Sequence, residues 1–131
     1  MESMTRPAIP DDLKRFVLTC IPSVPYLEAM LLLRRESDRA WTAHELAQRL
    51  YLPEARTAAL LAALEGAGIA LLAQPDGRHY RYGPSTELAA MVERLANYYS
   101  TNLTGVTNLI HSAVGRRAYD FANAFRWRKD S

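Results

Sequence analysis

One stretch in the middle of the chain, residues 42–82, carries the boundary signals of two short helices and a hairpin in close succession. Thr42 and Glu45 have the spacing of a capping box, in which each side chain binds the other residue's backbone amide at a helix start. Pro53 favours the start of a second helix, because its ring fixes φ at a helical value. Gly68 favours the end of that helix, since glycine readily adopts a left-handed backbone. This spacing predicts a short helix, a tight turn and a second helix.

Two short strands are expected next. Residues 69–73 and 79–82 are mostly apolar or aromatic, and Pro75 to Arg78 stands between them. These four residues are typical of a turn, and Gly77 among them is free to take a positive φ. Trp41, just before the first helix, is expected on a short strand of its own.

The flanking segments complete the predicted organisation. Residues 1–23 are expected to form a loose arm and a short helix, with Cys20 as a buried thiol. Residues 24–84 form the central domain, which begins with an apolar helix near Pro25. Residues 85–131 are expected to hold one long helix, from Glu87 to about Ala113, and a basic, aromatic tail. The predicted class is mainly α with a small β-hairpin.

Composition limits the classes of protein that fit. The chain has 131 residues, 49% hydrophobic content and a formal net charge of +2, which fits one globular domain with an extension. No apolar run approaches the length of a membrane span, and no secretory signal is visible. With a single cysteine as well, these points favour the cytoplasm and exclude a membrane partner.

The expected long helix carries an apolar seam in alternating steps of four and three residues, typical of a helix that pairs with another helix. Its members are Leu88, Val92, Leu95, Tyr99, Asn102, Val106 and Leu109. The seam packs either on its own domain or on a second copy. Because it follows a segment that already has a complete set of core residues, we favour a homodimer.

The motif Leu61-x-x-Leu64-Glu65-x-x-Gly68-Ile69 before a hairpin resembles the winged helix-turn-helix of bacterial transcriptional regulators of the MarR and PadR families. The resemblance covers residues 42–82, and the long helix after the hairpin is similar to the dimerisation helix of PadR-like regulators. It implies a two-fold dimer on duplex DNA, with the second helix in the major groove and the hairpin, or wing, near the backbone or minor groove.

The DNA contacts expected from this arrangement are few. If Thr57, Leu61 and Leu64 face the core, only Arg56 on the outer face of the second helix can read a base, because the rest of that face is alanine. The wing offers more, and Arg34 and Arg35 add candidate phosphate contacts. The wing candidates are Arg78, His79 and Arg81. The alternative is that these elements have no binding role, so that the second helix is simply an Ala-rich helix and the hairpin is simply solvated.

No enzyme, metal or cofactor is predicted. His44, His79 and His111 lack ligands at metal-binding spacing, and the chain has no nucleophile elbow or phosphate-binding loop. The expected function is a DNA-binding transcriptional regulator. The alternative is a winged-helix protein-interaction module, for which the aromatic and basic tail from Phe121 to Lys129, within residues 116–131, would serve as a docking segment. The operator and any small-molecule effector stay open.

Overall fold

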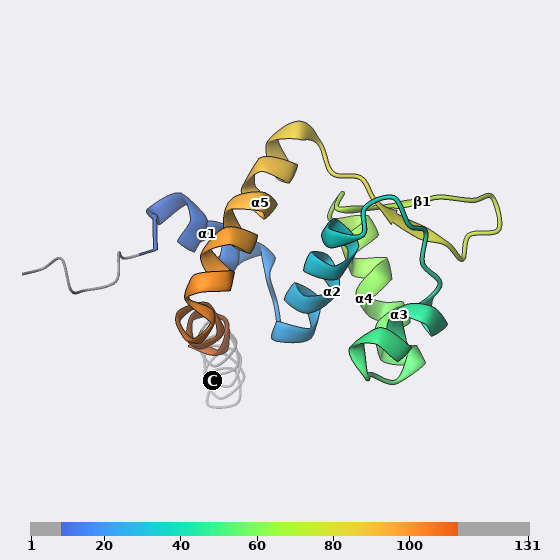
Figure 1. Ribbon diagram of the computed structural model, residues 1–131, viewed down its shortest axis with the longest axis horizontal. Helices are drawn as coiled ribbons and strands as arrows, with labels where there is room; N and C mark the ends of the chain where they lie inside the picture. The colour runs from blue at the N-terminus through green and yellow to red at the C-terminus, as the bar shows by residue number, and fades with distance from the viewer. Residues whose placement is uncertain (1–8, 113–131) are drawn as a thin grey trace, which may run out of the picture.

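The computed structural model describes residues 9–112 and is mainly helical, with one small antiparallel sheet (Figure 1). The elements are α1 (Asp11–Cys20), α2 (Val24–Arg35), α3 (Ala43–Leu50), α4 (Glu54–Gly66), β1 (Ala70–Leu72), β2 (Tyr80–Tyr82) and α5 (Thr86–Thr101), followed by a helical stretch over 103–112. The predicted class is confirmed at this level. The predicted arm before residue 9 and the predicted tail over 116–131 lie outside the described residues.

The helix starts follow the side chains that the sequence supplies. Both bonds of the predicted capping box are present at α3: Glu45 N donates to Thr42 Oγ1 over 3.2 Å, and Thr42 N donates to the Glu45 carboxylate over 3.0 Å. At the starts of α2 and α5 a serine alone forms the cap: Ser23 Oγ accepts from the Tyr26 amide, and Ser85 Oγ accepts from the Leu88 amide. After α4, Gly68 takes a φ of 81°, as predicted.

The hairpin of β1 and β2 is short, and a backbone bridge connects it to the segment before α3. Leu71 of β1 pairs with Arg81 of β2, and Gly77 at the tip takes a φ of 71°. Trp41 and Tyr80 exchange two backbone hydrogen bonds of 2.8 Å, so Trp41 lies along the free side of β2, as a single bridge. This bridge anchors the hairpin beside the start of α3.

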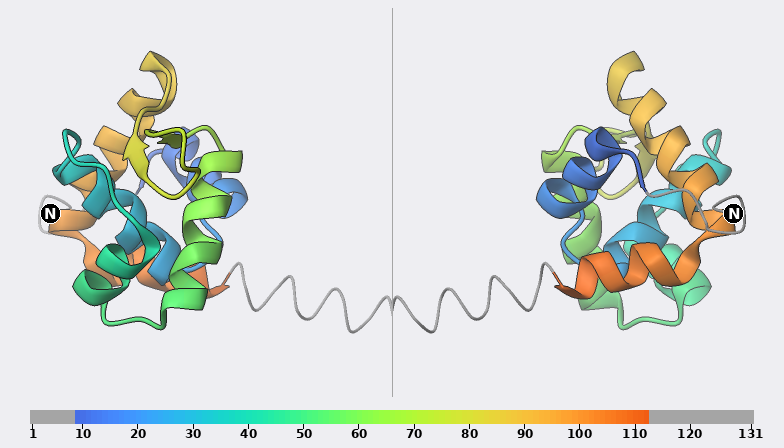
Figure 2. Two further views of the ribbon diagram at one scale, coloured as in Figure 1. Left: turned by 90° about the vertical axis from the view of Figure 1, so that its right-hand side faces the viewer. Right: turned by 90° about the vertical axis from the view of Figure 1, so that its left-hand side faces the viewer.

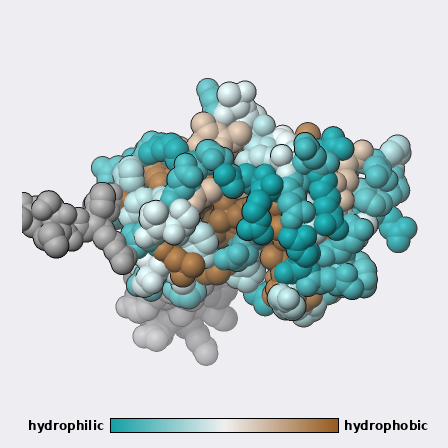
Figure 3. Space-filling view, viewed as in Figure 1, coloured by the Kyte–Doolittle hydropathy of each residue, from teal (hydrophilic) through white to brown (hydrophobic). Residues whose placement is uncertain are grey.

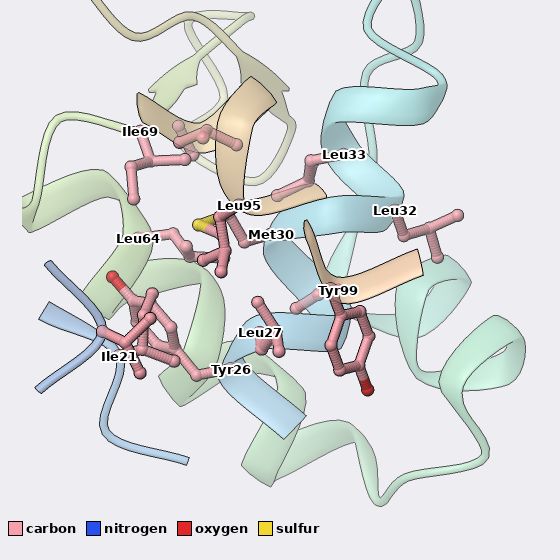
Figure 4. Packing of buried hydrophobic residues seen from close by; sticks show 14 of the residues in the cluster. Ile21, Tyr26, Leu27, Met30, Leu32, Leu33, Leu64, Ile69, Leu95 and Tyr99 are labelled. Atoms are coloured by element: carbon pink, nitrogen blue, oxygen red, sulfur yellow. The ribbon is translucent and has the colours of Figure 1, made fainter. Parts of the chain in front are cut away.

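One hydrophobic core joins all the helices. Leu27, Met30 and Leu33 of α2 are fully buried at its centre. Figure 4 shows side chains of α2 meeting Leu64 of α4 and Leu95 of α5 in the interior. The core also takes residues from α1 and from the 103–112 stretch, so the predicted segments share one interior.

The prediction of one helix from residue 87 to about 113 is wrong. The helix α5 ends at Thr101, and Asn102 has a φ of −144° and a ψ of 59°, outside the helical region. Asn102 Oδ1 accepts a hydrogen bond of 3.2 Å from Gly105 N, the pattern of an N-cap, so the side chain starts a new helical stretch instead of continuing the old one. Figure 2 shows the two stretches running in different directions.

The seam is buried inside its own chain. Val92, Leu95 and Val106 have no exposed surface, and Tyr99 is 9% exposed. Leu88 and Leu109 pack against the same core as partly buried residues, and Asn102 is partly buried. The reason for expecting a second copy, an apolar stripe without a partner, is therefore wrong: α1 and α2 supply the partner. A homodimer stays a prediction, but the buried residues cannot form its contact surface.

Cys20, the last residue of α1, is not in the environment that the sequence predicts. Cys20 is exposed, so the expectation of a buried thiol is wrong, because Val17 and Ile21 take the inward positions at the end of α1. In the described part of the chain, no single helix is long and apolar enough to cross a membrane.

Candidate nucleic-acid interface

A groove of about 490 Å³ lies between the start of α3, the first turns of α4 and the tip of the hairpin. Its lining includes His44, Glu54, Ala58, Asp76, Arg78 and His79. The end of the molecule that carries the hairpin has a mainly hydrophilic surface (Figure 3). The groove is the place where the second helix of the predicted motif and the hairpin come together.

Two histidine–carboxylate pairs stand in this groove. His44 Nδ1 of α3 lies 3.2 Å from Glu54 Oε1 of α4, and His79 Nδ1 lies 2.9 Å from Asp76 Oδ2 within the hairpin turn. The Arg78 amide donates to Asp76 Oδ1 over 2.8 Å. This amide, followed by the His79 ring, lowers the pKa of Asp76, so the carboxylate is held ionised at the tip.

The hairpin arginines differ in position. Arg78 is exposed and lines the groove, whereas Arg81 is exposed on β2 and is not part of the lining. Within residues 9–112 no carboxylate lies within ion-pair distance of either guanidinium. Both side chains are therefore free to bind an anion.

The helix α4 presents the predicted faces. Thr57, Leu61 and Leu64 are buried, and Arg56 is exposed among alanines. Arg56 follows Glu54 by two residues, a rotation of about 200° around the helix axis, and the groove is lined by Glu54 and not by Arg56. The structure therefore does not bring Arg56 together with the arginines of the hairpin.

The two arginines at the end of α2 lie elsewhere. Arg34 binds the Glu93 carboxylate of α5 through Nε and Nη2, each over 2.8 Å, and this pair lowers the pKa of Glu93. To bind a phosphate, Arg34 would have to break its ion pair with Glu93. Arg35 is exposed beside a second hollow of about 340 Å³ between α2, α3 and α5, which Arg34 also lines.

Sequence reasoning missed three groove residues, His44, Glu54 and Asp76, as parts of the site. Local chemistry alone accounts for two of them, because Glu54 suits the positive end of a helix dipole and Asp76 suits a turn. The available signal was that all three flank predicted element boundaries, where side chains from different elements meet. The described residues contain no group of three or more His, Cys, Asp or Glu side chains that could hold a metal ion.

Comparison with family models, with curated proteins and with solved structures finds no match to this chain. The groove and the elements that build it are therefore the basis for a functional proposal.

Proposed function

We propose that this chain is a winged helix-turn-helix protein that binds duplex DNA and acts as a transcriptional regulator. The observation that carries the proposal is the pair of guanidinium groups, Arg78 and Arg81, that have no ion-pair partner within residues 9–112 and lie on a hairpin that shares a groove with the start of α4. The order of elements supports it: α3 and α4 pack together across a tight turn, and the hairpin follows directly.

In this proposal α4 enters the major groove and the hairpin tip contacts the backbone or the minor groove. The small side chains on the outer face of α4 let the helix backbone approach the bases closely. Arginine in a narrow minor groove is favoured by the enhanced negative potential there. The net charge of +2 is low, so affinity depends on where the cations lie and not on total charge.

A salt titration tests the proposal. Arg78→Ala with Arg81→Ala should weaken binding to unrelated duplexes alike and lower the slope of log K against log salt by about 2, since each lost phosphate contact removes about 0.9. The matched control is Lys14→Ala with Arg15→Ala, which removes two exposed cations from α1, far from the hairpin (Figure 1). An equal loss of duplex affinity in both variants would contradict the proposal. So would the absence of duplex binding by the unmodified chain at about 50 mM salt.

A protein-interaction module is the second candidate, and the exposed alanine face of α4 favours it. Ala55, Ala59, Ala62 and Ala63 are all exposed, and such a smooth face offers a protein partner more than it offers base edges. A stable protein complex, together with failure to retard any duplex, would support this candidate against the first.

We also propose that the DNA-binding form of the chain is a two-fold homodimer. Because Val92, Leu95, Tyr99 and Val106 of the seam are buried, the dimer contact has to use other surface. Leu103 is a described apolar residue that is 56% exposed. Sedimentation equilibrium on the full chain decides the oligomeric state. A monomer at all concentrations would remove the dimer from the proposal.

A further inference from the structure

We propose that Glu54 is a base-reading residue of this interface and that it selects cytosine. The inference rests on the proposed DNA binding and names the base that the interface recognises. The observation behind it is that an exposed carboxylate, held from one side by His44, stands in the groove at the first position of α4.

In helix-turn-helix proteins the N-terminal residues of the second helix contact base edges. Glu54 is the first residue of α4, and its side chain is 62% exposed. Ala58, one turn later on the same flank, also lines the groove. Both residues face the space that a DNA duplex would fill if α4 and the hairpin bind it together.

An ionised carboxylate only accepts hydrogen bonds. In the major groove, guanine presents two acceptors and thymine presents one acceptor and a methyl group, so neither base can donate to Glu54. Cytosine presents the N4 amino group alone, whereas the amino group of adenine stands beside the N7 acceptor, which repels a carboxylate. Cytosine is therefore the base that fits.

His44 Nδ1 lies 3.2 Å from Glu54 Oε1, and among residues 9–112 no other side chain binds this carboxylate. One oxygen is thus held by α3 and the other is left to accept from a base. His44 is a positioning residue in this arrangement. The pair does little for the fold, because the two side chains are 65% and 62% exposed and exposed ion pairs stabilise weakly.

A carboxylate on a DNA-binding face also repels phosphate, so Glu54 reduces general affinity. The same charge rejects sites without an amino group at the reading position. This combination gives selectivity where the outer alanines of α4 offer little base readout.

Selection from a pool of randomised duplexes by the full-length chain tests the inference. The unmodified chain should enrich cytosine at one position of each bound site. Glu54→Gln should change that preference to adenine by about tenfold or more, because glutamine both donates to N7 and accepts from N6. His44→Gln should weaken the cytosine preference without a change of base. Glu65→Gln, which removes an exposed carboxylate from the far end of α4, should select like the unmodified chain.

The outcomes separate the two proposals. If the unmodified chain retains no duplex at low salt, DNA binding itself is wrong, and the chain is then tested for a protein partner. If it retains duplexes and Glu54→Gln enriches the same sequences, or if no position is enriched at all, Glu54 does not read a base and DNA binding stands. Circular dichroism of each variant shows that it is folded.

Discussion

Tyr51 is the one residue other than glycine with a positive φ in the described part of the chain, with φ 57° and ψ 44°. It ends α3 just before the turn into α4, and its side chain is 92% exposed. Helices often end with a left-handed residue, but this is usually glycine, because an L side chain in that region costs about 1–2 kcal/mol. The backbone of the turn therefore demands a conformation that its own side chain disfavours.

Replacing Tyr51 with glycine should raise the free energy of unfolding by about 0.5–1 kcal/mol. The left-handed penalty disappears, and the greater freedom of glycine in the unfolded chain offsets part of the gain. Urea denaturation measures the change. Gln48→Gly, at an exposed helical position of α3, is the control and should lose about 0.5–1 kcal/mol. A loss of stability in both variants would mean that the tyrosine ring contributes contacts of its own.

At the residue scale the sequence predicts what local chemistry decides. The cap at Thr42 and the positive φ of Gly68 and Gly77 follow from bonds and backbone freedom within a few residues. The exposure of Cys20 could not be predicted in this way, because it depends on which neighbours occupy the core side of α1. The left-handed Tyr51 could not be predicted either, because local backbone preference favours glycine there.

At the element scale the break at Asn102 shows the limit of periodicity. The apolar pattern continues through residue 102, yet the side chain of Asn102 caps a new helical stretch. A seam read as continuous is therefore divided between two helical stretches, and both halves are buried in one core. A pattern of apolar residues reports which positions are buried, but it does not report whether the helix axis bends between them.

Two glycine-to-alanine variants test this description. Gly105 is in the first turn after the break, and an added Cβ there would lie 2.7 Å from Asn102 Nδ2 and 2.8 Å from Oδ1. Gly105→Ala should therefore fail to stabilise the chain, although alanine is favoured over glycine in a helix by about 1 kcal/mol. Gly66→Ala, at the end of α4 with nothing within 4 Å, should gain up to about 1 kcal/mol. A comparable gain at Gly105 in chemical denaturation would contradict the cap.

At the scale of the whole molecule, α5 is fastened to two other helices. Arg94 of α5 binds Asp12 of α1 over 2.6 and 3.0 Å, and the neighbouring Glu93 binds Arg34 of α2. These contacts join residues 82 and 59 positions apart in the chain. The sequence predicts that the helix has an apolar face, but the same face would suit a second copy. Only the three-dimensional placement of α1 and α2 decides between the two.

The ion pair between Asp12 and Arg94 makes stability depend on pH in a defined direction. The Arg94 guanidinium, as a hydrogen-bond donor, lowers the pKa of Asp12 from 3.8 to about 2. A carboxyl group whose pKa is lower in the folded state stabilises the fold above its unfolded pKa, and this contribution is lost as the pH falls through the folded value. The contribution of Asp12 is therefore complete above about pH 5 and declines towards pH 2.

Thermal unfolding of Asp12→Asn measures that contribution. At neutral pH the variant should unfold at a lower temperature than the unmodified chain, because the charged pair with Arg94 is lost. Below about pH 4 the difference should shrink, since Asp12 of the unmodified chain then takes up a proton more readily in the unfolded state. The control is Asp11→Asn, which removes the same charge from the same turn of α1. Asp11 is exposed and has no ion-pair partner within residues 9–112. The difference in unfolding temperature between Asp11→Asn and the unmodified chain should therefore not show this pH dependence. If the Asp12→Asn difference stays constant from neutral pH down to about pH 2, the ion pair does not hold α1 against α5 in solution.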